Sequence, residues 1–138
     1  MSYQITWEPD GVLVSFAAPV TARDLIGSVR NMHADSRFDE GSYVINQLPD
    51  EVCPTLTEDA LIELAALNYG AYTSHPNSRI VFVTTDAALG QLIESVLMRP
   101  ELASYQVKAF NSLVAARDWL EAQPNLHIMS SVMGLRLR

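Results

Sequence analysis

The sequence has a single cysteine, Cys53, among its 138 residues. One cysteine excludes a disulfide framework and a cysteine-based zinc cluster, and it is typical of a reducing compartment. The chain also lacks a run of 18 or more apolar residues, and its first ten residues do not combine a charged start with an apolar core. We therefore expect neither a membrane span nor a secretory signal, and we expect a cytoplasmic protein.

Motifs that carry a specific chemistry are also missing. The six glycines are scattered, so they form no phosphate-binding loop, and no Gly-x-Ser-x-Gly pattern is present. His33, His75 and His127 do not have the HxxxH or HExxH spacing of metal sites. Cys53 has acidic neighbours, which disfavour the reactive thiolate. The sequence thus predicts no enzyme, no cofactor and no metal site.

Basic residues are scarce. Nine Lys and Arg stand against 16 Asp and Glu, which gives a net charge of −7. The imbalance lies in residues 35–63, where Arg37 is the only basic residue. The acidic residues of this segment are Asp35, Asp39, Glu40, Asp50, Glu51, Glu58, Asp59 and Glu63. Such a charge repels nucleic acid. We expect either a solvated acidic surface or a docking face for a basic partner.

Alternation of apolar and polar residues predicts the strands. Residues 3–8 and 12–16 form a hairpin around Pro9-Asp10-Gly11, in which the glycine supplies a positive φ. Residues 43–45 and 80–83 are apolar on both faces, as in inner parallel strands, and residues 80–83 are the central strand. Residues 105–110 form the last strand.

Capping residues and apolar stripes predict four helices. The first begins at Thr21, with Asp24 in a capping-box position, and fades near Asp35. The second runs from Thr57 to about residue 72. The third begins at Asp86 and is bounded by Pro100, and the fourth begins at 111 or 112 and ends at 124. In the fourth helix, Val114, Trp119 and Leu120 are expected to face inward.

These elements define a fold class. Their order is β-β-α-β-α-β-α-β-α, which predicts an α/β domain with a single mixed, mostly parallel five-stranded sheet flanked by four helices. We assign residues 1–124 to this domain. Residues 125–138 form an apolar C-terminal tail, which we expect to pack on a neighbouring subunit of a homodimer or back on its own domain. The expected interface residues are Ile128, Met129, Val132, Met133, Leu135 and Leu137.

A binding site has a predictable place. In open parallel sheets ligands bind beyond the carboxyl ends of the strands. Neutral hydrogen-bonding residues are found there and at the start of the second helix. They are Asn46, Gln47, Thr57, Thr84, Thr85, Asn111 and Ser112. Either they bind a ligand or partner, or they cap helices.

Three segments resemble the STAS, or anti-sigma-factor-antagonist-like, superfamily with its CRAL-TRIO-like relatives. The segments are the hairpin 5–16 with the helix start 21–24, residues 33–38 leading into the strand 43–46, and the strand and cap 107–112 followed by Ala115-Ala116 and Trp119-Leu120. The resemblance implies a regulatory or ligand-sensing module. Phosphorylated antagonists carry a serine after the third strand, whereas residues 46–57 here contain none.

We therefore expect a non-enzymatic regulatory or protein-interaction module of the STAS-like type, acting as a homodimer. A first alternative is a binding protein for a small apolar or lipid-like ligand, with a cavity lined by Leu61, Leu64, Phe82 and Leu92. A second alternative is an enzyme that uses the Cys53 loop.

Overall fold

Five strands form one mixed sheet in the order β1-β2-β3-β4-β5. The computed structural model describes residues 3–50, 56–102 and 104–124. The strands are β1 (Tyr3–Trp7), β2 (Gly11–Phe16), β3 (Tyr43–Gln47), β4 (Arg79–Val83) and β5 (Gln106–Phe110). β1 is antiparallel to β2, and all other neighbours are parallel. The predicted fold class is confirmed.

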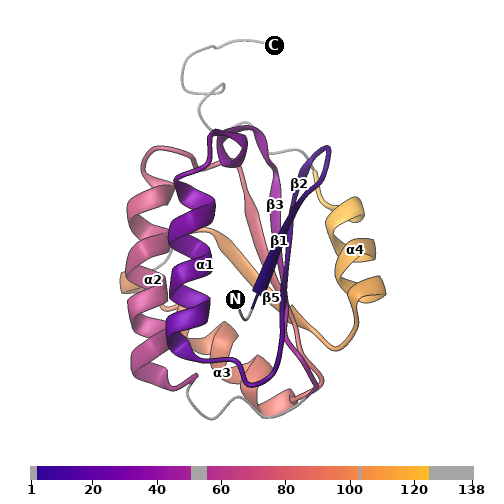
Figure 1. Ribbon diagram of the computed structural model, residues 1–138. Helices are drawn as coiled ribbons and strands as arrows, with labels where there is room; N and C mark the ends of the chain where they lie inside the picture. The colour runs from indigo at the N-terminus through magenta and orange to yellow at the C-terminus, as the bar shows by residue number, and fades with distance from the viewer. Residues whose placement is uncertain (1–2, 51–55, 103, 125–138) are drawn as a thin grey trace.

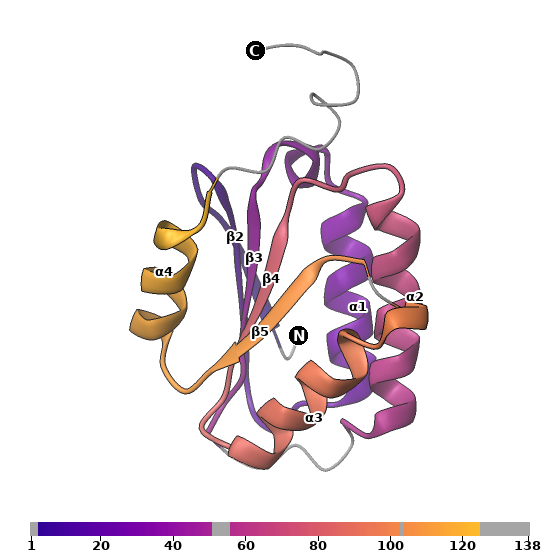
Figure 2. The same ribbon diagram turned by 180° about the vertical axis from the view of Figure 1, so that it is seen from behind.

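Four α-helices cover the sheet. They are α1 (Ala22–His33), α2 (Glu58–Tyr72), α3 (Ala87–Leu97) and α4 (Leu113–Ala122), and the short 3₁₀ helices η1 (Ser36–Glu40) and η2 (Pro100–Leu102) connect them to strands. Helices α1, α2 and α3 lie on one face and α4 lies on the other (Figures 1 and 2). Right-handed crossovers between strands in sequential order place all three connecting helices on the same face. None of the described helices is long and apolar enough to cross a membrane.

Each α-helix begins at a residue that the sequence identifies. The Thr21 hydroxyl accepts the Asp24 N–H at 3.1 Å, and the Asp24 carboxylate accepts the Thr21 N–H, which completes the predicted capping box. Thr57, Asp86 and Ser112 cap α2, α3 and α4 in the same manner. Because these contacts span only three residues, the local sequence is sufficient to predict them.

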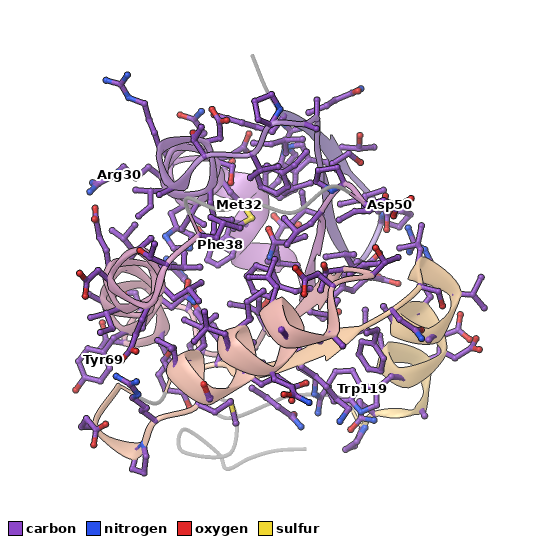
Figure 3. The ribbon with its side chains drawn as sticks, turned by 90° about the horizontal axis from the view of Figure 1, so that it is seen from below. Arg30, Met32, Phe38, Asp50, Tyr69 and Trp119 are labelled. Atoms are coloured by element: carbon purple, nitrogen blue, oxygen red, sulfur yellow. The ribbon has the colours of Figure 1, made fainter. Side chains whose placement is uncertain are left out.

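The main core lies between the sheet and helices α1, α2 and α3. Every residue of β4 is buried, as predicted for an inner strand, but the central strand of the sheet is β3, so the predicted central position of residues 80–83 is wrong. Phe38 of η1 closes the core near Met32 of α1, and both side chains point inward in Figure 3. A smaller cluster beneath α4 contains Ile45, Val81 and Val83, with Trp119 packed against it.

Two expectations about single residues are wrong. Val114 is 71% exposed, because it lies on the outer side of α4 while Ala116 contacts the sheet. Gly11 does not have a positive φ, and no described glycine does.

Gly11 is required for a different reason. A Cβ atom at this position would lie 2.6 Å from the ring of Tyr43, which is the residue beside it on β3. The ring therefore packs directly on the glycine backbone. By contrast, a Cβ atom at Gly70 in α2 would meet nothing within 4 Å, so this glycine is a weak point inside the helix.

We predict opposite effects for alanine at these two glycines. Gly11→Ala should lower the free energy of unfolding by about 1–3 kcal/mol, because the Tyr43 ring must shift. Gly70→Ala should raise it by about 0.5–1 kcal/mol, because alanine is the better helix former. Urea denaturation of both variants measures the two changes. A Gly11→Ala variant as stable as the parent would contradict the packing described here.

Candidate functional site

The carboxyl ends of β4 and β5 border a cleft against α3. Thr84, Asp86, Gln91, Glu94 and Asn111 contribute its polar side chains, and its volume is about 370 Å³. Two of the predicted site residues, Thr84 and Asn111, are thus brought together. The cleft lies where a ligand of a parallel sheet is expected.

Some polar groups of this cleft also support the fold. The Thr84 side chain is buried, and its hydroxyl accepts the Asp86 N–H at 3.1 Å. The Asp86 carboxylate accepts the Leu89 N–H at 3.1 Å as the cap of α3. Asn111 and Gln91 are both exposed and make no side-chain hydrogen bond to another described residue. Among the described residues, these two amides therefore have no role in the fold.

Helix α3 also closes the outer edge of β5. The Glu94 carboxylate accepts the Ala109 N–H at 2.6 Å, and the Met98 sulfur accepts the Val107 N–H at 3.3 Å. A Cβ atom at Gly90 would lie 3.4 Å from the Ala109 Cβ, which is an ordinary packing contact between α3 and β5. Because these two N–H groups of β5 are already bonded, fewer groups remain for another strand to pair with. Sequence analysis missed Glu94 and Met98, since their contacts join residues nine and fifteen positions apart.

The remaining predicted site residues do not line this cleft. Thr57 and Ser112 are exposed, and their hydroxyls accept the N–H groups of Ala60 and Ala115 as helix caps. Thr85 is exposed and donates to the Asp50 carboxylate at 3.4 Å. Gln47 is half-buried at the end of β3.

Asn46 faces inward, beneath α1 and α2. It is 3% exposed, and its Oδ1 atom has no hydrogen-bond partner among the described residues. It lines an internal cavity of about 10 Å³ with Asn68, and the other walls are apolar. A cavity of this size holds about one water molecule, which would donate to Oδ1.

The acidic segment 35–63 does not form one continuous face. Asp35 pairs with Arg37 at 2.7 Å, and Glu58 of α2 pairs with Arg99 at 2.5 Å. Hydrogen bonds from Arg37 lower the pKa of Asp35 to about 2. Asp35, Asp39 and Glu40 precede β3, whereas Asp50 follows it. Acidic residues therefore lie at both ends of the strands, and several are already paired.

A second polar group surrounds Phe38 at the amino end of β3. The His33 ring lies 4.7 Å from the Phe38 ring, and the His75 ring lies 6.2 Å from it on another side. His75 Nε2 lies 3.1 Å from the Asp39 carboxylate, beside a hollow of about 150 Å³. Burial, together with the nearby His75, lowers the pKa of His33 below its usual 6.5.

This lowered pKa predicts a loss of stability in mild acid. The unfolded chain binds a proton at His33 near pH 6.5, whereas the folded chain resists it. The stabilisation is therefore complete above pH 6.5 and is lost as the pH falls through the folded pKa. Urea unfolding between pH 7.5 and about 5.5 should show this fall, and His33→Gln should make it shallower. Equal slopes for both proteins would contradict the prediction.

Glu8 fastens α4 to the sheet. Its carboxylate accepts two hydrogen bonds from Arg117 of α4, at 2.8 and 3.1 Å, and one from the Tyr43 hydroxyl. The Arg117 hydrogen bonds lower the pKa of Glu8. Burial, followed by the hydrogen bond to Glu8, raises the pKa of Tyr43 to about 12. Glu8 thus stays ionised and Tyr43 stays protonated, as the contact requires.

Several predicted residues lie outside the described residues. These are Cys53, His127 and the tail positions Ile128, Met129, Val132, Met133, Leu135 and Leu137. Across residues 3–50, 56–102 and 104–124, no group of three or more His, Cys, Asp or Glu side chains is placed to hold a metal ion.

Comparison with known proteins does not add a relative. No family model matches the chain, and neither a curated protein nor a solved structure matches it.

Proposed function

We propose that this chain is a non-enzymatic regulatory or protein-interaction module of the STAS-like type, which works in the cytoplasm. The supporting features are the opening hairpin with the helix start that follows it, the connection into β3, and the closing strand and helix, which are the segments that carry the resemblance. The single cysteine supports the reducing compartment.

The α3–β5 cleft is the observation that carries the proposal. It combines two amides with spare hydrogen-bonding capacity, Gln91 and Asn111, with the carboxylates of Asp86 and Glu94. Thr85 and Asp50 lie on the same carboxyl end of the sheet. A partner that supplies hydrogen-bond donors and positive charge complements this surface.

The alternative of an apolar or lipid-like ligand receives no support from the interior. Leu64 and Phe82 line the internal cavity beneath α1 and α2, which has a volume of about 10 Å³. Pockets for small molecules usually have roughly 300–1,000 Å³. The carrier function stays a hypothesis without a supporting observation.

Photo-crosslinking in the native host tests the interaction surface. A photoreactive amino acid is placed at Asn111 or Thr85, which are exposed at the carboxyl end, and at Glu40 of η1 as the control. The proposal predicts that the same partner protein is captured from positions 111 and 85 and not from position 40. Capture from position 40 alone, or the same capture from all three positions, would refute the docking surface.

We further propose that the tail, residues 125–138, mediates homodimer formation, because half of its residues are large and apolar. Light scattering should then give a particle mass twice that of a single chain. Replacing Val132 and Leu135 with aspartate, or shortening the chain to 1–124, should give a monomer. All described elements end before residue 124, so the shortened chain retains them. The same number of chains per particle in the parent protein, the aspartate variant and the shortened chain would exclude the tail from assembly.

A further inference from the structure

The two edges of the sheet differ in what covers them. At the β5 edge, the N–H groups of Val107 and Ala109 are bonded by side chains of α3. No described strand pairs with the outer edge of β1, and Figure 1 shows α1 on one side of this strand and α4 on the other. Exposed edges are usually protected by charged side chains, proline or a bulge. β1 contains no charged residue and no proline, and its register with β2 is unbroken.

The main-chain groups at this edge are placed to bond a further strand. The Glu8 N–H donates to the Gly11 carbonyl at 2.8 Å, which fixes the phase of the hairpin. Bonded pairs alternate along an antiparallel ladder, so Gln4 and Thr6 bond β2 while their neighbours point their N–H and C=O groups outward. These neighbours are Tyr3, Ile5 and Trp7. No other described residue hydrogen-bonds their main-chain groups.

The two faces of β1 need different neighbours. Tyr3, Ile5 and Trp7 are half-buried and pack against the main core on the side of α1. Gln4 and Thr6 are exposed on the opposite face, and their side chains form no hydrogen bond with a described residue. A strand added at this edge therefore requires apolar side chains on one face and polar side chains on the other.

The tail has such a pattern. Residues 133–138 alternate strictly, and six extended residues span about 20 Å, close to the length of β1. The apolar positions are Met133, Leu135 and Leu137, and the others are Gly134, Arg136 and Arg138. The tail also has no acidic residue, whereas the whole chain has a net charge of −7. The alternation favours a strand, and the positive charge favours binding to an acidic chain.

We propose that the tail of one copy adds to the outer edge of β1 of the other copy as a further strand. This inference rests on the proposed role of the tail in homodimer formation. Main-chain hydrogen bonds join the tail to the outward groups of β1, and its apolar residues extend the core on the side of α1. Its two arginines lie beside Gln4 and Thr6, whose side-chain oxygens accept hydrogen bonds. In a two-fold dimer each copy gives one tail and receives one, so both edges are closed.

Amide hydrogen exchange in the full-length chain, followed by NMR, tests the added strand. The comparison is with the variant that carries Val132→Asp and Leu135→Asp. In this variant the outward amides of Ile5 and Trp7 should exchange at least about tenfold faster than in the parent, because an unpaired edge amide exchanges without local unfolding. The amide of Thr6, which bonds β2, is the internal control and should change far less.

A charge on the exposed face of β1 gives a second test. Thr6→Lys places a positive charge beside Arg136 and Arg138, and should weaken the dimer by about 2- to 30-fold, the magnitude of two exposed charge pairs. Arg136→Glu with Arg138→Glu should restore the dimer of the Thr6→Lys chain. Ala66→Lys adds the same charge at an exposed position of α2 and should leave the dimer unchanged. Sedimentation over a range of concentrations measures the dissociation constants.

The outcomes separate the place of the tail from its role in assembly. Unchanged exchange at Ile5 and Trp7 in the aspartate variant, or equal effects of Thr6→Lys and Ala66→Lys, would overturn the pairing with β1. If the aspartate variant is nevertheless a monomer, the role of the tail in dimer formation stands. A monomeric parent chain with slow exchange at Ile5 would overturn the exchange of tails between copies, and with it the homodimer. None of these outcomes depends on the crosslinks from Asn111.

Discussion

The structure depends on one constraint, the need of a parallel sheet for cover on both faces. Strands in sequential order send every crossover helix to the same face, so α1, α2 and α3 shield only one side. The other side is left to α4, the last described element of the chain. The contact of Arg117 with Glu8, across 109 positions, ties this helix to the first hairpin. The hairpin and the last helix are thus parts of the same structural solution.

The same constraint decides where free surface remains. The faces of the sheet are occupied by helices, and the β5 edge is closed by Glu94 and Met98 of α3. Surface remains open in the described structure at the carboxyl ends of the strands, on the outer sides of the helices and at the outer edge of β1. The α3–β5 cleft belongs to the first of these, and the proposed place of the tail is the third.

Sequence analysis predicted what local interactions determine. The caps at Thr21, Thr57 and Asp86 involve residues three positions apart, and the alternation of 3–8 needs only one strand. The errors concern long-range packing. Gly11 must be small because the ring of Tyr43, on another strand, packs on it. Val114 is exposed because it lies on the side of α4 that faces away from the sheet. Neither turn residues nor the spacing of apolar residues along a helix indicates what packs against Gly11 or Val114.

The acidic segment shows the same limit for charge. Residues close in sequence were expected to share one surface, but β3 separates Asp39 from Asp50 by its whole length. Ion pairs with Arg37 and Arg99 then neutralise part of what remains. The net charge of a segment therefore predicts a docking face only when its residues lie on one side of an element. Asn46 likewise ends up buried beneath α1 and α2, because successive residues of a strand point to opposite faces of the sheet.

A polar residue at the end of a strand has two possible interpretations, because the start of a helix and a bound ligand both need hydrogen-bonding side chains. Thr84 and Asp86 illustrate this, since both lie in the cleft and both hold the first turn of α3. Residues that the fold does not use are more informative. Asn111 and Gln91 are exposed in the same cleft, and their amides bond no described residue.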